Sequence, residues 1–355
     1  MKILTRYLAV SIIKLILVVF CVILAVEFFV LLVAEFADIG TGNYGILQAI
    51  FYVVLSLPTN LYSLFPMVGL LGSIIGLGLL SNHNELTVMR ASGMGVSEII
   101  IIVMKAALVV IVTVTLMGEF VAPTAQRYAN TIKLVAESGG QAADTAQGIW
   151  MKSDQNFIHI RTVTKDFKLY GVKQYSFNAA HQLTSALVAK RAAISPQKQW
   201  FLYDVRQSHI TDHGVTVDTL PKVQWDVSIN THLLGISSDH AAEMSLPDLL
   251  RYIHYQHKND INASSLSLAF WQRVFQPFAS LVMIFLAIPF IFGSLRRVTM
   301  GVRIVTGAVV GFLFYMLNQF FGPFSLVYQI PPMLGAAFPI LLFAFVAFFL
   351  MRRVR

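Results

Sequence analysis

The sequence has little of what most soluble enzymes depend on. It contains a single cysteine, Cys21, which excludes a disulfide framework and a cysteine-ligated zinc or iron–sulfur site. Only 12% of its 355 residues are charged, against about 25% in soluble domains. It has no Gly-x-x-x-x-Gly-Lys-Ser/Thr loop to hold ATP and no Gly-x-Ser-x-Gly turn to present a nucleophile. We therefore expect neither ATP binding through a P-loop nor a catalytic residue in this chain.

The basic charge and the histidines do not indicate a soluble binding site either. The formal net charge of +8 would suggest nucleic acid in a soluble protein, but here the cations flank apolar segments and indicate a membrane. The pairs His209/His213 and His254/His257 are spaced like metal ligands. The first pair falls in a strand-and-turn region and the second has no cysteine nearby, so we predict solvent-exposed histidines and no metal site.

Long apolar runs are what the sequence has in abundance, since 56% of its residues are hydrophobic. A helix needs about 20 apolar residues to cross the hydrocarbon core. Six segments approach or exceed this length: Leu15–Ala34, Leu61–Leu80, Ile99–Leu116, Leu266–Phe292, Ile304–Phe321 and Pro332–Leu350. The stretch Ile46–Leu57, just before Pro58, is too short to cross, and we predict a separate interfacial helix there. The sequence thus predicts an α-helical polytopic membrane protein with six transmembrane helices.

The loops on the two sides of these spans differ in basic residues. One side carries Lys2, Arg6, Arg90, Arg296, Arg297, Arg303, Arg352, Arg353 and Arg355. The short connections of the other side, about 35–60 and 322–331, contain Glu35 and Asp38 but no lysine or arginine. Because cytoplasmic loops are enriched in basic residues, we expect both termini in the cytoplasm and the long insert between the third and fourth spans outside it.

That insert changes to a hydrophobic period of two. In 156–163, for example, Ile158 and Ile160 would face a core while their neighbours face solvent. Short runs of this kind predict an antiparallel sandwich or half-open roll, joined to the membrane by helical stretches at about 125–136 and 245–255. The expected domains are 1–120 with spans one to three, 121–264 with the β-domain and its connecting helices, and 265–355 with spans four to six.

Small and charged residues within the spans suggest how the helices pack. Four glycines are spaced for close helix contact, either within the chain or with a second subunit: Gly72, Gly76, Gly307 and Gly311. Glu27 and Arg273 lie at similar depths, about 10 Å inside the outer boundary. Since an unpartnered charge in a membrane costs several kcal/mol, we hypothesise that they pair with each other or with a partner subunit.

The loop between the second and third spans has the sharpest local pattern. Residues at about 82–95 are typical of a short amphipathic helix closed by glycine, with Glu85, Leu86, Met89 and Arg90 on one face. Such a helix is either an ordinary membrane-surface helix or the element that a permease offers to a separate motor domain.

This loop resembles the coupling-helix motif of the LptF/LptG family of lipopolysaccharide-export permeases. The family pattern of glutamate, apolar residues, methionine, any residue and Ala-Ser-Gly stands here at 85–93. Further motifs in register lie along nearly the whole chain: Phe65-Pro66-Met67, Gly118-Glu119, Phe275-Gln276-Pro277, Met300-Gly301-Val302-Arg303 and Phe321-Gly322-Pro323. The C-terminal third is closer to the LptG members than to the LptF members.

The resemblance implies six spans with a periplasmic β-jellyroll-like domain inserted between the third and the fourth. It further implies a permease subunit of an ABC transporter in the inner membrane, which extracts lipopolysaccharide and passes it to a periplasmic bridge. The expected partners are an LptF-like permease, an LptB-like ATPase dimer that binds ATP and Mg²⁺, an LptC-like bitopic protein and an LptA-like bridge. This chain itself would bind no cofactor and no nucleic acid. The alternatives are an LptF-type paralogue and a non-transporting membrane sensor or scaffold.

The same resemblance, together with the chemistry of lipid A, suggests which residues contact the substrate. Acyl chains need an apolar lining, for which the fifth span offers Phe314, Phe320 and Phe321, and phosphates need cations near the rim. The candidate cations are Arg127, Lys133 and Arg273, and Lys133 falls where family members carry a basic residue implicated in headgroup contact. One departure stands out, because the family's lysines at the outer end of the first span are replaced here by Glu35 and Asp38.

Overall fold

The computed structural model describes residues 2–137, 149–153, 155–163, 169–178, 182–194, 199–211, 214–225, 241, 244–259, 261–294 and 298–353. The helical segments are α1 (Lys2–Glu35), α2 (Ile46–Asn82), α3 (Glu85–Ala91), α4 (Val96–Leu116), η1 (Met117–Val121), α5 (Ala122–Glu137), α6 (Leu246–Lys258), α7 (Ser264–Pro289), η3 (Phe290–Ser294), α8 (Met300–Val327) and α9 (Pro332–Arg352). Six of the helices so formed are long and apolar enough to cross a membrane, which confirms the six predicted spans.

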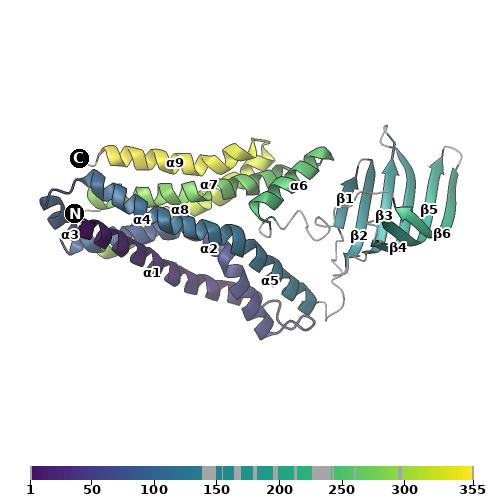
Figure 1. Cartoon of the computed structure of the whole chain (residues 1–355), viewed down its shortest axis with the longest axis horizontal. Helices are drawn as coiled ribbons and strands as arrows, with labels where there is room; N and C mark the ends of the chain where they lie inside the picture. The colour runs from purple at the N-terminus through teal and green to yellow at the C-terminus, as the bar shows by residue number, and fades with distance from the viewer. Residues whose placement is uncertain are drawn as a thin grey trace.

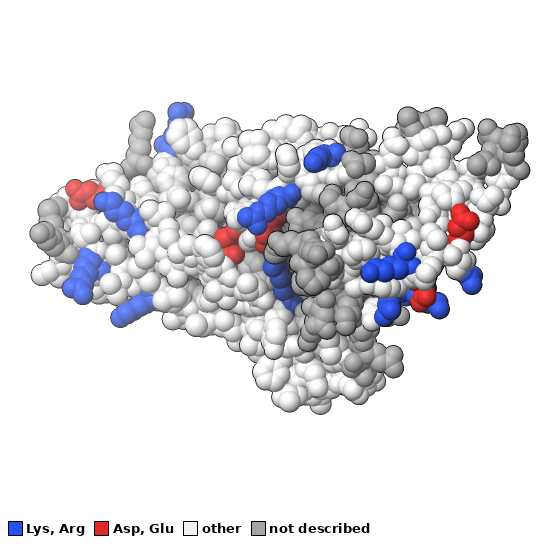
Figure 2. All heavy atoms as spheres, turned by 45° about the vertical axis from the view of Figure 1, so that its right-hand side comes forward, with Lys and Arg blue, Asp and Glu red and all other residues white. Residues whose placement is uncertain are grey.

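The long helices lie side by side, with both chain ends and α3 at one end of the bundle and the β-sheet beyond the other (Figure 1). Among the six spans α2 is the most buried, because α1, α4, α7 and α8 all pack around it. On the face in Figure 2, lysine and arginine gather at the end remote from the sheet, near the helix–sheet junction and on the sheet, and leave an uncharged belt between. This distribution is typical of a multi-pass membrane protein.

The four glycines singled out in the spans all pack within the chain. A Cβ atom built at Gly72 would lie 2.6 Å from Cα of Ile16 in α1, and one at Gly76 would lie 3.0 Å from Cδ1 of Ile12. Gly307 and Gly311 of α8 meet Ile74 and Met67 of α2 in the same way. Of the two alternatives that the spacing left open, the structure favours packing within the chain.

The predicted break before Pro58 is wrong. The stretch expected to form an interfacial helix continues into the second span as the single helix α2, with Pro58 and Pro66 inside it. Each proline removes one backbone hydrogen bond from the helix, a loss that tight packing against neighbouring helices offsets. The 37 residues of α2 give a rod of about 55 Å, longer than the hydrocarbon core is thick.

The insert contains one six-stranded antiparallel sheet, formed by β1 (Ile149–Ser153), β2 (Asn156–Val163), β3 (Leu169–Phe177), β4 (Leu183–Ile194), β5 (Trp200–Thr211) and β6 (Gly214–Trp225). The strands pair in chain order, so the sheet is a simple meander. Ile158 and Ile160 are fully buried, as their spacing predicted, in a cluster that also holds Leu202 and the two tryptophans Trp200 and Trp225. Within the described residues there is one sheet and no second layer, which favours a half-open roll over a sandwich.

Two helices lie along the chain at the positions where helical stretches were predicted, α5 after the third span and α6 before the fourth. On the outgoing side α4, η1 and α5 follow one another without a break, so the expected boundary at 120/121 falls inside a continuous helical segment. On the return side α6 begins with Ser245 as its N-cap, whose hydroxyl accepts a hydrogen bond from the Asp248 backbone N–H. Both α5 and α6 are thus ordered helices.

Candidate functional site

The helix expected to meet a motor domain is α3, at the end of the bundle that also holds both termini (Figure 1). It is shorter than the predicted 82–95. Asn84, with a φ of 58°, precedes it and Gly93, with a φ of 94°, follows it, so turns in the left-handed region bound it on both sides. Leu86 and Met89 are buried in the main core of the spans, which fixes the helix against the bundle.

The two charged residues of the predicted α3 face are placed differently from the two apolar ones. Arg90 is exposed, whereas Glu85 is half-buried, with its Oε1 3.8 Å from Nδ1 of His83. The Oε2 atom of Glu85 is buried and has no hydrogen-bond partner among the described residues, but the Glu85 carboxylate has a hydrogen bond with the Tyr7 phenol of α1. The acid at the start of α3 is thus tied to the first span and is only partly exposed.

At the opposite end of α1, an outer acid–lysine cluster explains the unexpected acids. The ammonium of Lys133 in α5 donates to Glu35 (2.8 and 3.1 Å) and to Asp38 (2.7 Å). It also lies over the rings of Tyr44 and Tyr52, 5.6 and 4.9 Å from their centroids. Glu35 and Asp38 are therefore paired within the chain, and they tie the end of α1 to α5.

Tyr44 completes this cluster. Its hydroxyl donates to Glu35 at 2.7 Å, and burial together with this hydrogen bond to a carboxylate raises the pKa of the Tyr44 phenol above its ordinary value. The backbone N–H of Asn43 donates to the carbonyl of Ala136 at 2.7 Å and fastens the turn after α1 to the end of α5. Within the described residues no three His, Cys, Asp or Glu side chains come together, so this cluster offers only two carboxylates to a cation, with Lys133 bound between them.

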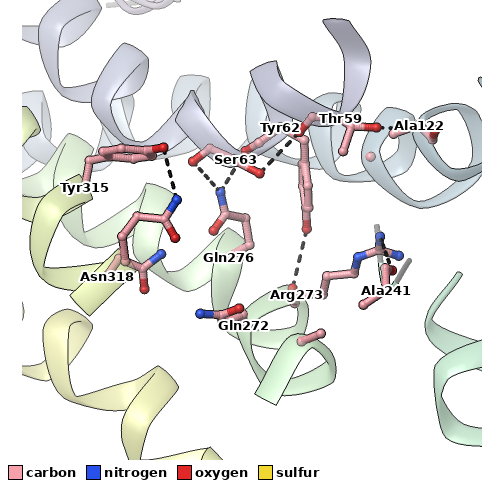
Figure 3. Close-up of a pocket in the computed structure, with 13 residues that line it drawn as sticks. Thr59, Tyr62, Ser63, Ala122, Ala241, Gln272, Arg273, Gln276, Tyr315 and Asn318 are labelled. Carbon is pink, nitrogen blue, oxygen red and sulfur yellow. Dashed lines mark hydrogen bonds between the residues drawn. The ribbon is translucent and has the colours of Figure 1, made fainter. Parts of the chain in front are cut away.

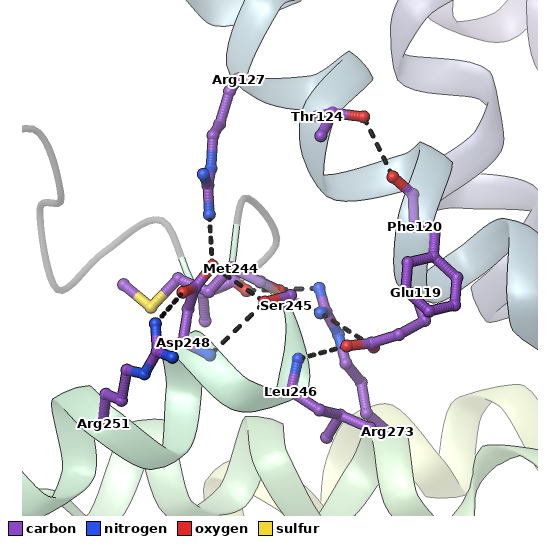
Figure 4. A network of polar contacts seen from close by, with 11 residues as sticks. Glu119, Phe120, Thr124, Arg127, Met244, Ser245, Leu246, Asp248, Arg251 and Arg273 are labelled. Atoms are coloured by element: carbon purple, nitrogen blue, oxygen red, sulfur yellow. Dashed lines mark hydrogen bonds and ion pairs between the residues drawn. The ribbon is translucent and has the colours of Figure 1, made fainter. Parts of the chain in front are cut away.

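A second set of charges joins the outgoing and returning connections (Figure 4). This junction network consists of Glu119 in η1, Arg127 in α5, Arg273 in α7, and Ser245 and Asp248 at the start of α6. Arg273 lies 4.0 Å from Glu119 and donates to the backbone carbonyls of Met244 and Ala241. Glu119 in turn accepts a hydrogen bond from the Leu246 N–H at 2.6 Å.

The hypothesis that Arg273 pairs with Glu27 is therefore wrong, because among the described residues the carboxylate within ion-pair distance of Arg273 is Glu119. Depth along a span, which suggested the pair, does not determine which helices are neighbours. Glu119 could have been noticed as the acid at the exit of the third span, but its partner on a distant span was not visible in the sequence. Arg273 thus holds the start of α6 against η1 rather than facing α1.

Arg127 closes the network on its other side. Its guanidinium donates to the Asp248 carboxylate at 2.9 Å, and the Ser245 hydroxyl donates to the same oxygen at 2.8 Å. Burial alone would raise the pKa of Asp248, but these two hydrogen bonds and the arginine charge lower it below its ordinary value. Two of the predicted phosphate ligands, Arg127 and Arg273, thus meet in one internal network, while Lys133 belongs to the outer acid–lysine cluster.

A polar cavity of about 280 Å³ lies between α2, η1, α7 and α8 (Figure 3). Amide, hydroxyl and guanidinium groups from several spans line it: Thr59, Tyr62, Ser63, Gln272, Arg273, Gln276, Tyr315, Asn318 and Gln319. Gln276 donates to the backbone carbonyls of Tyr62 and Ser63 (2.7 and 3.1 Å) and links α7 to α2. Sequence reasoning missed this cavity because its residues form no local motif. The only available signal was the recurrence of amide side chains within apolar spans.

The three phenylalanines proposed to line a lipid cavity differ in exposure. Phe320 is 59% exposed, and Phe321 packs on Phe338 with ring centroids 4.4 Å apart. Phe314 is only 4% exposed and packs edge-on against Phe343 of α9. Phe314 is therefore a packing residue between α8 and α9 in this structure, because it lies on the side of the helix that faces the bundle.

Comparison with known proteins decides the family. Residues 6–353 match the family described as lipopolysaccharide export system permease LptF/LptG. The chain belongs to the LptF/LptG family. Over 354 residues it is 36% identical to the lipopolysaccharide export system permease protein LptG of Haemophilus influenzae, which covers 99% of each chain. It is 35% identical to the Escherichia coli K12 protein of the same name over 353 residues, 99% of this chain and 98% of that one. As a member of a permease family, it is a transport subunit built on six spans with an inserted antiparallel sheet.

Proposed function

We propose that this chain is the LptG-type permease subunit of a lipopolysaccharide exporter in the inner membrane of a Gram-negative bacterium. The observation that carries this proposal is the agreement over almost the full length with proteins named LptG, which favours this function over an LptF-type paralogue and over a sensor or scaffold. The subunit would pair with an LptF-like permease, while an LptC-like protein and an LptA-like bridge would carry lipopolysaccharide away from it.

The proposed orientation places α3 and both termini in the cytoplasm and the sheet in the periplasm. Basic residues on the loops of the α3 side support it, because such residues favour the cytoplasmic face. The uncharged belt in Figure 2 supports a membrane between the two ends of the bundle. In this orientation α5 and α6 lead from the membrane to the sheet, and lipopolysaccharide leaving the bundle would pass along them.

The energy would come from a separate LptB-like ATPase that binds ATP and Mg²⁺ and docks on α3. Leu86 and Met89 hold α3 to the bundle, and the half-buried Glu85 carboxylate, held by the Tyr7 phenol of α1, is the acid at the start of the helix that a basic group of the motor would meet. Because its apolar side is fixed to the bundle, α3 can pass a displacement on to the spans without coming loose from them. Glu85 is thus the residue on which motor binding depends most.

Substrate contact would divide between the two permeases. The exposed Phe320 of α8 is suited to acyl chains, whereas Arg127, Lys133 and Arg273 are already engaged by carboxylates and carbonyls. A lipid phosphate would have to exchange with those partners. We therefore propose that the LptF-like partner supplies more of the phosphate-binding cations than this chain does.

The test is co-purification of the chain with its ATPase. Glu85→Ala should weaken retention of the ATPase and Glu85→Lys should abolish it, while membrane insertion and yield stay unchanged. Glu98→Ala is the matched control, because Glu98 is an exposed acid at the same end of the bundle but lies in the first turn of α4. Full retention of the ATPase by Glu85→Lys would contradict the proposed docking.

A further inference from the structure

The largest fully buried side chain in the described part of the chain is that of Arg303, near the start of α8, which is 2% exposed. Its Nη1 donates to the backbone carbonyl of Gly78 at 3.0 Å and to Oδ1 of Asn82 at 2.9 Å. Both acceptors lie in the last turns of α2. Burying a guanidinium is unfavourable unless good hydrogen bonds offset it, so the contact of Arg303 with the end of α2 depends on these two acceptors.

The local structure is fitted to this contact, which we call the inner joint (Gly78, Asn82 and Arg303). A Cβ atom at Gly78 would lie 3.1 Å from Sδ of Met300 and 3.3 Å from Nη1 of Arg303, so the glycine lets α8 approach α2 closely. The cation also sits at the carboxyl end of α2, where the helix dipole favours positive charge. The hydrogen bonds are directional, so they fix the register of α8 on α2.

The inner joint lies immediately before α3. Only His83 and Asn84 separate Asn82 from Glu85, the first residue of α3. Leu86 and Met89 of α3 belong to the same buried core as the end of α2. A displacement of α3 is therefore passed to Asn82, one of the two acceptors of Arg303, through only two intervening residues.

Beyond the inner joint, most of α8 is less closely packed within the chain than α2 is. Far less of it is buried than of α2. It carries the exposed Phe320 and contributes Tyr315, Asn318 and Gln319 to the polar cavity. Its further contacts with α2, at Gly307 and Gly311, are close apolar contacts that add no hydrogen bond. Arg303 is thus a polar contact that fastens the cytoplasmic end of α8 to the α2–α3 corner.

We propose that Arg303 is a positioning residue that transmits the movement of α3 to α8. Each cycle of ATP hydrolysis by the docked ATPase would then displace the side of α8 that faces lipid. This inference rests on the proposed function, because it assumes that α3 receives the motor. The residue does not touch the substrate or the nucleotide. Without it, α3 would still bind the ATPase, but the movement would be lost at the α2–α8 contact.

The experiment compares variants in the complete exporter reconstituted in proteoliposomes, and the quantity measured is lipopolysaccharide released per ATP hydrolysed. Arg303→Met removes the hydrogen bonds to Gly78 and Asn82 and should lower this ratio about tenfold or more, because hydrogen bonds from a charged donor are among the stronger ones. Asn82→Ala removes one acceptor at an exposed position, is expected to fold normally, and should lower the ratio by a smaller factor. ATPase retention and the rate of ATP hydrolysis should stay near the wild-type values in both.

Rescue separates positioning from a merely structural role. In Arg303→Lys the single ammonium cannot hold both acceptors equally well, so the ratio should fall, and adding Asn82→Asp supplies a charged partner that should restore most of it. Thr306→Val is the matched control, because this exposed α8 hydroxyl donates only to its own helix, at the Val302 carbonyl, and its loss should leave the ratio unchanged.

The outcomes are distinct. A wild-type ratio in Asn82→Ala and in Arg303→Lys would overturn the inference and leave the proposed function intact. Loss of yield, ATPase retention and transport in parallel across all these variants, without rescue by Asn82→Asp, would also overturn it, since Arg303 would then be only structural. If the wild-type chain bound no ATPase, the proposed function would fail and the inference with it.

Discussion

Different kinds of interaction hold the helices together at the two ends of the bundle. At the inner end, α1, α2, α4 and α7 pack through aliphatic side chains and glycines, with one buried guanidinium bound to two neutral acceptors. At the outer end, the outer acid–lysine cluster and the junction network join α1, α5, α6, η1 and α7 through opposite charges. The inner end is suited to transmitting a displacement as a rigid body. The outer end depends on ion pairs and on hydrogen bonds from charged side chains.

The largest effect is expected at the outer end, where Arg273 and Glu119 form a largely buried pair with side chains 14% and 18% exposed. Arg273→Ala leaves Glu119 and the carbonyls of Met244 and Ala241 without their cation. We expect the free energy of unfolding to fall by about 3 kcal/mol or more, measured as a lower Tm of the purified chain in detergent. The double variant Glu119→Gln/Arg273→Gln should lose less than the two single changes added together, and simple additivity would contradict the pairing.

A change at the inner end should cost less and should not depend on salt. In Gly72→Ala the new Cβ would lie 2.6 Å from the Ile16 backbone, so α1 must move away from α2. We expect a loss of about 1–3 kcal/mol, equal in low and high salt because no charge is involved. Tm values measured in 50 mM and 500 mM salt check this, and a salt-dependent loss would remove the distinction between the two ends. Gly301→Ala is the control, because nothing lies within 4 Å of a Cβ atom at Gly301.

The smallest expected effect is the pH dependence of the Arg127–Asp248 contact. The pKa of Asp248 is lowered in the folded protein, so its contribution to stability is present above the ordinary aspartate pKa of about 3.9 and is lost as the pH falls through the lowered value. Because both side chains are partly exposed, the contribution is below about 1 kcal/mol. Relative to wild type, Asp248→Asn should lower Tm slightly at pH 6, and the difference should shrink as the pH is lowered below about 3.9. A difference that stays the same over this range would contradict the assignment.

The sequence was sufficient for features that depend on local pattern. Hydropathy located the six spans, the period of two located the sheet with Ile158 and Ile160 inside, and helical spacing located α3. It predicted a helix break at Pro58 that the structure does not have, because a proline ends a helix in water more reliably than within a packed bundle.

The contacts between distant segments were not predictable from the sequence in the same way. Lys133 and Glu35 are 98 positions apart, and Arg303 and Gly78 are 225 apart. Each of these side chains has several possible partners at a similar depth, and the choice depends on helix order around the bundle, which no local pattern encodes. The polar cavity was missed for the same reason, since each span contributes only a few of its residues.

The most direct test of the account is photocrosslinking from α8 in the assembled exporter. A photoreactive amino acid at Phe320, which is exposed, should form an adduct with lipopolysaccharide, and the adduct should change in yield when ATP is hydrolysed. The same probe at Phe314, buried against Phe343, should form none. Adducts with phospholipid alone at Phe320, in a complex that contains lipopolysaccharide and hydrolyses ATP, would contradict a lipopolysaccharide path along this helix.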